Sequence, residues 1–417
     1  MKVKPQKKQA LPGWIAIRCF PVFVELACLL LAITPADAQT FTVLHTFMGK
    51  GDGKGPDARV ILGSDGALYG ATGGGGSFDL GSIFKLDRSG HETLVHSYWG
   101  GDGLGPGDST SAREGVLYSV TAYGGTPEGG GWDYGSGTVF TLDKAGKYTI
   151  FHRFNGKSDG GGPEGPLLQG AKGNLYGITS FGGDLRCGSY YQGCGVIFTL
   201  DAKGNETVIH TFTLGDGLEY PGPVIRDNAG NFYGTAAPIN QAGLIFKLDS
   251  SGKVTVLYTF TGGSDGYYPV GPLLRDAEGN LYGVTAWGGE YSCGLVFRLD
   301  PTGKETVLHQ FEGQVYGKSD DGCGPEAGLI RDRAGNFYGT TTVGGSSGYG
   351  TVFKLDPSGK ETVLYSFAGG SGGASPGTVL LLDAVGNFYG TTSAGGDTSC
   401  DQRDYVPGCG IVYKLTP

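Results

Sequence analysis

After its first forty residues, the sequence lacks any glycine-free stretch that is long enough for an ordinary helix. Glycine supplies 82 of the 417 residues. Each glycine inside a helix costs about 1 kcal/mol relative to alanine, so a long helical bundle is excluded. Charged residues are also scarce, at 17% of the chain, whereas 23 Tyr and 21 Phe give too much aromatic surface for a disordered polymer. The composition therefore predicts a folded chain that is nearly all β.

Clustered basic residues are missing from most of the chain. The formal net charge is −9 and the Lys and Arg residues are spread singly, so nucleic acid is not an expected partner. Basic residues concentrate only near the start, ahead of the apolar run from Phe20 to Ile33 and the small residues Ala36 and Ala38. We predict that residues 1–38 are a signal peptide cleaved before Gln39, with an uncleaved anchor as the alternative. The mature protein is then secreted, extracellular or periplasmic, without a membrane span.

Six of the 8 Cys follow the predicted leader, and an even number in an exported protein favours disulfides. Two pairs close short loops, and we expect the third pair to join neighbouring loops; the predicted bridges are Cys187–Cys194, Cys400–Cys409 and Cys293–Cys323. Six cysteines formally allow 15 connectivities. The sequence contains no Cys-x-x-Cys pair, so neither a metal site nor a cofactor is expected.

Three short motifs recur seven times in a fixed order, and successive copies lie about 50 to 60 residues apart, as in propeller blades and kelch-like arrays. The first motif contains an aromatic or leucine residue followed by Tyr-Gly, at Tyr69, Tyr118, Tyr176, Tyr233, Tyr282, Tyr338 and Tyr389. The second resembles Thr-Val-Phe-Lys-Leu-Asp, centred on Phe84, Phe140, Phe198, Phe246, Phe297, Phe353 and Tyr413. The third ends at Phe47, Tyr98, Phe154, Phe212, Phe260, Phe311 and Phe367.

Each repeat reads as four short strands, because a shorter apolar segment precedes every Tyr-Gly motif. Tight Asp-x-x-Gly turns separate strands one and two, as at Asp227, and strands three and four, as at Asp356. The segment 41–47 is a lone fourth strand, and the segment 410–415 is a lone third strand. Pairing the two would close a ring without free edges. We therefore predict an all-β fold, in which residues 39–417 form one seven-bladed β-propeller of four-stranded antiparallel blades, closed by the N-terminal strand.

In such a blade the loops between strands two and three lie on the same face as the links between blades. The links carry Asp-Gly turns at Asp52, Asp102, Asp159, Asp216, Asp265 and Asp321. We interpret these aspartates as structural, with a bound cation as the alternative. Five of the 6 His share one position of strand four, at His45, His96, His152, His210 and His309. Tyrosine occupies this position in two other repeats, which indicates packing.

Residues repeated in every blade belong to the scaffold, so we look for function where the loops between strands two and three differ. These loops combine aromatic rings with charged groups, which are typical of a concave sugar or peptide site. The candidate ligand-binding residues are Trp132, Tyr134, Arg186, Tyr190, Tyr191, Trp287, Glu290, Tyr291, Asp401, Arg403 and Tyr405. Packing of the glycine-rich loops by the same aromatic residues is the alternative. No catalytic set converges in the sequence.

The segments 335–341 and 350–365, which read GNFYGTT and GTVFKLDPSGKETVLY, resemble the bacterial GloVer tandem repeat. The resemblance covers essentially residues 41–417. It implies an exported bacterial repeat protein, often one with a surface-anchoring segment. The present sequence shows no such segment after Leu415, so the resemblance does not extend to anchoring. The family supplies no catalytic residues.

Together these features predict a non-catalytic binding or scaffold module whose long-loop face contacts a glycan, peptide or protein. The alternative is an extracellular glycosidase or lyase that uses loop carboxylates, namely Asp133, Glu290, Asp401 or Asp404. Two carboxyl groups about 5 to 10 Å apart would favour hydrolysis.

Overall fold

Short antiparallel strands make up nearly all the regular structure in the computed structural model. The structure describes residues 39–417 except 109, 112–114, 127–134, 171–172, 188–192, 239–240, 315–317 and 401–405. Two short 3₁₀ turns, η3 (Leu214–Asp216) and η4 (Gly370–Gly372), lie among the strands. Across the same ranges, no helix has the length and apolarity needed to cross a membrane.

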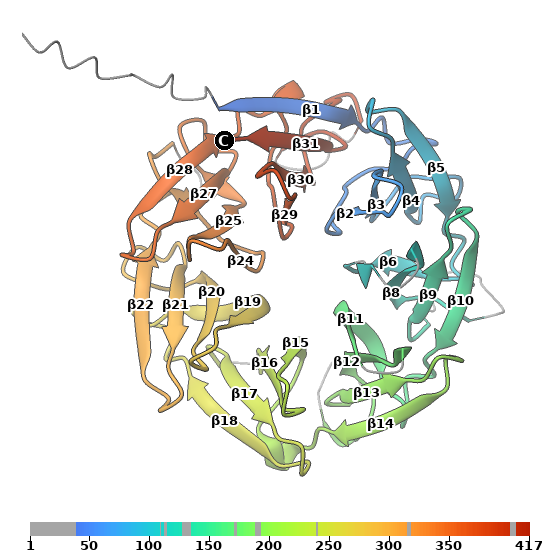
Figure 1. Ribbon diagram of the computed structural model, residues 1–417, viewed down its shortest axis with the longest axis vertical. Helices are drawn as coiled ribbons and strands as arrows, with labels where there is room; N and C mark the ends of the chain where they lie inside the picture. The colour runs from blue at the N-terminus through green and yellow to red at the C-terminus, as the bar shows by residue number, and fades with distance from the viewer. Residues whose placement is uncertain are drawn as a thin grey trace, which may run out of the picture. The chain divides into compact units, whose positions relative to one another are not determined.

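The strands form seven sheets arranged in a ring (Figure 1), as the repeats predict. Blade 1 contains β2 (Ile61–Leu62), β3 (Leu68–Thr72), β4 (Ser82–Leu86) and β5 (Glu92–Ser97). Blade 2 contains β6 (Leu104–Pro106), β7 (Thr110–Ser111), β8 (Leu117–Tyr123), β9 (Thr138–Leu142) and β10 (Tyr148–Arg153). Blade 3 contains β11 (Gly161–Gln169), β12 (Leu175–Phe181), β13 (Val196–Leu200) and β14 (Glu206–Thr211).

The remaining blades repeat this order. Blade 4 contains β15 (Pro221–Arg226), β16 (Phe232–Ala236), β17 (Leu244–Leu248) and β18 (Val254–Thr259). Blade 5 contains β19 (Tyr267–Arg275), β20 (Leu281–Trp287), β21 (Leu295–Leu299) and β22 (Glu305–Gln310). Blade 6 contains β24 (Ile330–Arg331), β25 (Phe337–Thr341), β27 (Thr351–Leu355) and β28 (Glu361–Ser366). A separate pair, β23 (Gly322–Cys323) and β26 (Val343–Gly344), joins the link before blade 6 to a loop of that blade.

Blade 7 closes the ring with strands from both ends of the described chain. It contains β29 (Leu381–Leu382), β30 (Phe388–Thr392), β31 (Ile411–Thr416) and β1 (Thr40–Thr46). Strand β1 lies antiparallel to β31, from the pair Thr40 and Thr416 to the pair Thr46 and Ile411, as the blue and dark red arrows in Figure 1 show. The predicted fold, blade number and closure are confirmed.

The glycine of the Tyr-Gly motif is required by the packing of the neighbouring strand. In blade 4, Gly234 lies opposite Phe246 on the neighbouring strand. A Cβ atom on Gly234 would lie 2.9 Å from the Phe246 ring, which is too close for a carbon contact. The same pair recurs, for example, as Gly339 and Phe353. The missing side chain therefore makes room for the large buried ring of strand three.

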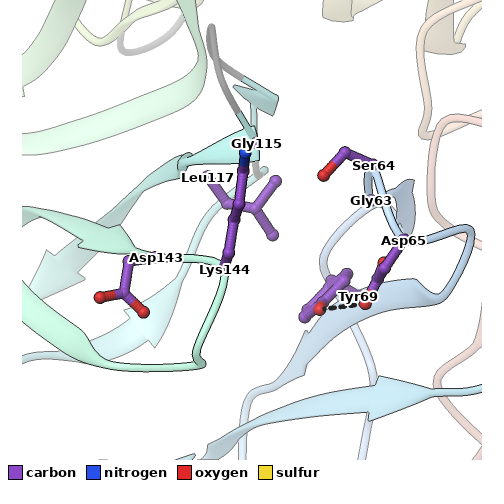
Figure 2. A pocket seen from close by; sticks show the side chains of 8 residues that line it. All are labelled: Gly63, Ser64, Asp65, Tyr69, Gly115, Leu117, Asp143 and Lys144. Atoms are coloured by element: carbon purple, nitrogen blue, oxygen red, sulfur yellow. Dashed lines mark hydrogen bonds between the residues drawn. The ribbon is translucent and has the colours of Figure 1, made fainter.

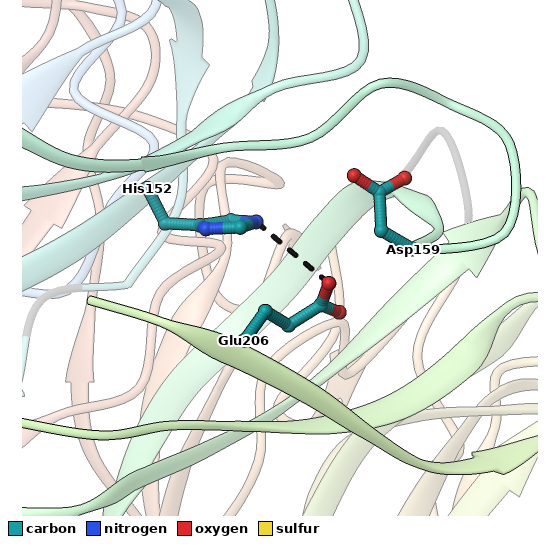
Figure 3. Close-up of side chains that lie close together, drawn as sticks. All are labelled: His152, Asp159 and Glu206. Atoms are coloured by element: carbon teal, nitrogen blue, oxygen red, sulfur yellow. Dashed lines mark ion pairs between the residues drawn. The ribbon is translucent and has the colours of Figure 1, made fainter.

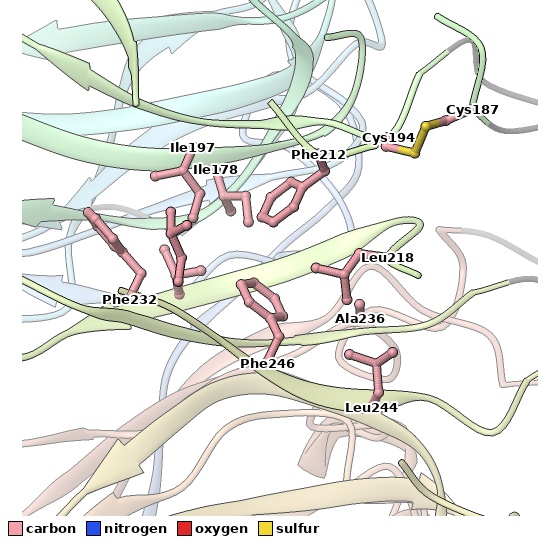
Figure 4. Packing of buried hydrophobic residues seen from close by; sticks show 12 residues of the cluster. Ile178, Cys187, Cys194, Ile197, Phe212, Leu218, Phe232, Ala236, Leu244 and Phe246 are labelled. Carbon is pink, nitrogen blue, oxygen red and sulfur yellow. A yellow bond between two sulfur atoms is a disulfide. The ribbon is translucent and has the colours of Figure 1, made fainter. Parts of the chain in front are cut away.

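The blades are joined to one another by aromatic pairs. The last aromatic residue of each outer strand packs edge-on against the strand-three ring of the next blade. Phe212 and Phe246 form such a pair at 5.4 Å between centroids, within the buried cluster of Figure 4. Both rings are fully buried. Two of the three repeated motifs thus build the interface between blades, which explains why they occur seven times.

On the face of the ring opposite the links, aspartate side chains stabilise the tight turns. Asp227 Oδ1 accepts hydrogen bonds from the backbone N–H groups of Ala229 and Asn231, at 2.9 Å each. Its Oδ2 accepts from Asn231 Nδ2 at 2.8 Å and from the Tyr233 hydroxyl at 3.1 Å. These four bonds lower the pKa of Asp227, although its partial burial acts in the other direction. The predicted structural role of the turn aspartates is confirmed.

Candidate functional site

The residue before the link proline has a left-handed backbone conformation in every blade. Its φ lies between 49° and 67° at Gly55, Gly105, Gly162, Tyr220, Tyr268, Gly324 and Ser375. At five of the seven, the N–H donates to a carbonyl in a loop of the preceding blade, as Tyr268 does to Ala242 at 2.7 Å. Glycine adopts this conformation freely, whereas a residue with a side chain is strained by about 1 kcal/mol or more. Three blades therefore hold a strained side chain at a position that four blades give to glycine.

Carboxylates occupy the residue after the proline in three blades. These are Asp57, Glu164 and Glu326, and all three are exposed even though they belong to the innermost segments. The surrounding blades reduce the hydration of these groups. This loss raises the pKa of Asp57 and that of Glu164 to about 7, and it also raises the pKa of Glu326. Among the described residues, no ion pair joins any of the three to a basic side chain.

Two of these carboxylates, from different blades, act on the same tyrosine. The negative charges of Glu164 in blade 3 and Glu326 in blade 6 both act on the hydroxyl of Tyr268 in blade 5. Together with its burial, they raise the pKa of that hydroxyl. Tyr268 is nevertheless 45% exposed, and its ring stacks with that of Tyr267 at 6.4 Å. We call Asp57, Glu164, Glu326 and Tyr268 the central site.

A cavity of about 590 Å³ is lined by residues of blades 6, 7 and 1, and Asp57 is the member of the central site that lines it. Its walls include Lys54, Asp57 and Ser375 together with glycines of neighbouring loops. The Lys54 ammonium lies 3.0 Å from the Asp79 carboxylate, so this cation is paired away from Asp57. The cavity therefore presents a carboxylate beside uncharged backbone, in a volume that fits a peptide side chain or a small ligand.

Four of the predicted loop residues lie in the described part of the chain. Arg186 is 81% exposed at its side chain, and its guanidinium pairs with Asp184 at 2.6 Å. Trp287 ends β20 opposite Tyr267, which places it beside the central site. Tyr291 is 48% exposed, and the charges of Glu312 and Glu290 raise the pKa of its hydroxyl. Trp287 and the pair Glu290 and Tyr291 therefore belong to blade 5, whereas Arg186 belongs to blade 3.

The other predicted loop residues lie outside the described residues: Trp132, Asp133, Tyr134, Tyr190, Tyr191, Asp401, Arg403, Asp404 and Tyr405. Of the four carboxylates considered for catalysis, the structure therefore describes Glu290 alone.

All three predicted disulfides form. Cys187–Cys194 and Cys400–Cys409 each close one loop, while Cys293–Cys323 joins the blade 5 loop to the next link. The three bridges lie in the loops and links of one face of the ring. Because they are paired, these cysteines offer no free thiolate as a nucleophile or metal ligand.

The histidines of strand four pack as predicted and also face the link aspartates. His96, for example, lies edge-on to Tyr98, and its Nε2 is 2.7 Å from Asp102 Oδ2. The link aspartates also accept backbone hydrogen bonds, as Asp102 does from the Trp99 N–H at 3.0 Å. These contacts give the link aspartates a structural role, while the predicted alternative of a bound cation stays a prediction.

A second cavity, of about 210 Å³, lies between blades 1 and 2 near the tight turns (Figure 2). Asp65 in its wall accepts a hydrogen bond from the Tyr69 hydroxyl at 2.9 Å and pairs with Lys85 at 2.7 Å. These contacts hold the pKa of Asp65 at about 2. Since the same aspartate and tyrosine pair recurs in other blades, this cavity belongs to the scaffold.

The repeated motifs of the sequence do not reveal the central site. Aligning the seven repeats on their link prolines would have shown that three of them have Tyr or Ser before the proline where the other four have glycine. The same alignment places Asp57, Glu164 and Glu326 at one position.

Solved structures share the fold at low sequence identity. The extracellular domain attributed to a hybrid two-component system of B. thetaiotaomicron matches with a TM-score of 0.54 and 13% identity, over 91% of this chain and 42% of that one. Puromycin hydrolase matches with a TM-score of 0.54 and 13% identity, over 81% of this chain and 50% of that one. A gluconolactonase from Xanthomonas campestris matches with a TM-score of 0.45 and 11% identity, over 86% of this chain and 93% of that one. The chain spans half or less of the length of the first two proteins, and the likeness to these two shows the fold alone.

No curated protein matches the sequence. A family model, described as the Gloeobacter/Verrucomicrobia repeat, matches residues 29–191 and 187–402. These two ranges cover most of the propeller, in agreement with the resemblance noted from its motifs. The chain belongs to the Gloeobacter/Verrucomicrobia repeat family.

Proposed function

We propose that the protein is an exported, non-catalytic binding module that holds a basic peptide segment at its central site. The observation that carries this proposal is the position shared by Asp57, Glu164 and Glu326, three carboxylates from separate blades that lack basic partners among the described residues. Lysine or arginine side chains of a bound segment would supply the missing counter-charge.

Aromatic residues support the same ligand. Tyr268 and Tyr267 are 45% and 41% exposed, respectively, and Tyr268 keeps its strained backbone close to two of the carboxylates. An exposed ring beside acidic groups favours cations, because the ring face attracts positive charge. Strain retained at an exposed side chain is typical of ligand sites. A glycan could stack on these tyrosines, but it would leave the carboxylates without a counter-charge.

Fluorescence anisotropy with a labelled tetralysine peptide tests the proposal, with a Gly-Ser peptide of equal length as the uncharged control. We expect saturable binding of tetralysine that weakens as salt is added, and at least a tenfold loss of affinity in Tyr268→Ala. Equal binding of both peptides, or no binding at low salt, would refute it. A hit on a glycan array without peptide binding would favour the sugar ligand instead. Sugar release from that glycan would favour the glycosidase or lyase.

A further inference from the structure

Three groups that can bind a metal meet at the seam between blades 2 and 3, away from the central site. They are His152 at the end of β10, Asp159 in the link, and Glu206 at the start of β14. One ligand atom from each lies within 4.8 Å of the other two. Figure 3 shows the imidazole directed toward Glu206, with 4.0 Å between Nε2 and Oε2, and Asp159 beside them.

The hydrogen bonds made by these residues leave a ring nitrogen of His152 and a carboxylate oxygen of Glu206 without a donor. The carbonyl of Gly204 lies 3.2 Å from His152 Nδ1, and a carbonyl can only accept, so Nδ1 carries the proton. Nε2 of the neutral ring is then a lone-pair donor to a metal, an arrangement common among ligating histidines. Asp159 is held by the Asn155 N–H at 3.0 Å. Within the described part of the chain, His152 Nε2 and Glu206 Oε1 are buried without a hydrogen-bond partner.

The other seams between blades place their histidines in different surroundings. Two of them carry the same residue types: His45 lies 3.5 Å from Asp52 and His309 lies 3.3 Å from Asp321, and Glu92 and Glu361 begin β5 and β28 as Glu206 begins β14. Between blades 1 and 2, His96 lies 2.7 Å from Asp102, and Tyr148 replaces the glutamate and stacks on the imidazole at 4.0 Å. Between blades 3 and 4, His210 and Asp216 are present, but β18 begins with Val254. The seam of His152 is the one place in the described ranges where three such ligand atoms come within 4.8 Å of one another.

We propose that His152, Asp159 and Glu206 bind a divalent transition-metal ion of the Zn²⁺ class. One imidazole and two carboxylates suit Zn²⁺, whereas Ca²⁺ and Mg²⁺ prefer sites made of oxygen atoms alone. With bonds of about 2.0 to 2.2 Å, two ligands of a tetrahedral ion lie about 3.3 to 3.6 Å apart. The three groups, now within 4.8 Å of one another, therefore need to move together by up to about 1.5 Å. The ion would link the outer strands of blades 2 and 3, and a fourth position would remain for water.

The test is isothermal titration of the metal-stripped protein with ZnCl₂, together with measurement of the bound zinc after desalting. We expect one tight equivalent per chain, and at least a tenfold loss of affinity in both Glu206→Gln and His152→Gln. The matched control is His210→Gln, in the seam that lacks a glutamate, and this variant should bind zinc as the unaltered protein does. CaCl₂ and MgCl₂ should give no comparable heat.

Thermal unfolding supplies a second readout. Zinc should raise the melting temperature of the unaltered protein and of His210→Gln, because a ligand that binds the folded state stabilises it. The shift should vanish in Glu206→Gln, whose melting temperature without metal also checks its folding. The proposal is overturned if no stoichiometric zinc binds, if both seam variants retain full affinity, or if His210→Gln loses it equally.

Discussion

The two faces of the ring are built by different means. The turn face repeats one solution, in which an aspartate accepts several backbone hydrogen bonds, as Asp227 and Asp356 do. The loop face differs from blade to blade, and it carries all six paired cysteines. A turn of fixed length can be stabilised by its own side chain, whereas longer loops need links between distant residues. Repetition therefore marks the scaffold, and departures from it mark the places where a ligand is to be sought.

Position 268 shows the value of such a departure. Four blades place glycine at the left-handed position before the proline, which is what the backbone alone requires. Blade 5 places Tyr268 there, at φ 63°, within the field of Glu164 and Glu326. Because the backbone does not require a tyrosine at this position, the proposed function assigns Tyr268 to recognition.

The largest expected effect on stability comes from removing the disulfide Cys293–Cys323 of the loop face. Replacing both Cys293 and Cys323 by serine opens a bridge with a sequence separation of 30. The added freedom of the unfolded chain should lower the free energy of unfolding by about 3 to 4 kcal/mol. Urea denaturation measures the loss, and the reduced unaltered protein is the control. An unchanged unfolding midpoint would show that repeated contacts alone hold the loop face.

The turn face should respond to the loss of one aspartate. Asp227→Ala removes the acceptor of four hydrogen bonds and should cost about 2 kcal/mol, while leaving peptide binding unchanged. Asp227→Asn keeps an acceptor oxygen and should lose less. Urea denaturation and fluorescence anisotropy measure the two effects. A binding defect in a stably folded Asp227→Ala would contradict the separation of the faces.

The central carboxylates should make stability depend on pH. The pKa of Glu164 is about 7 in the folded protein, against 4.5 for an ordinary glutamate. The folded state therefore favours the protonated form, and the free energy of unfolding falls as the pH rises from about 4.5 to 7. Glu164→Gln removes this loss, so the free energy of unfolding of the variant should exceed that of the unaltered protein at pH 8. The difference should be at most about 1 kcal/mol, because the exposed carboxylate still reaches water. At pH 4 the difference should disappear, and urea denaturation at both pH values checks this.

The smallest effect concerns backbone strain. Tyr268→Gly releases the left-handed tyrosine and should leave stability unchanged or raise it by up to about 1 kcal/mol. Tyr267→Gly, at the adjacent position of β19, should lower it by about 1 kcal/mol because glycine loses more freedom on folding. Equal losses in the two variants, measured by urea denaturation, would argue against strain at Tyr268.

The sequence predicts the fold better than the site. Repeats fix the blade number, and the lone strands at 41–47 and 410–415 require each other to close the ring. The disulfides follow from loop positions. The central site depends on side chains 57, 164 and 326, whose common direction only the closed ring reveals. The same limit applies to His152 and Glu206, since they meet only where two blades are in contact.

The central claim is that recognition belongs to the middle of the loop face, and one comparison tests it most directly. Two variants each lose three acidic groups. The first replaces the central carboxylates, as Asp57→Asn, Glu164→Gln and Glu326→Gln. The second replaces three aspartates of the tight turns, as Asp227→Asn, Asp276→Asn and Asp332→Asn. Tetralysine affinity is then measured for both by fluorescence anisotropy at one salt concentration and at about pH 8, where carboxyl groups with a pKa of about 7 are ionised. We predict that the first variant loses at least tenfold in affinity and that the second stays within about twofold of the unaltered protein. Equal losses would show that net charge alone attracts the peptide and would contradict the account.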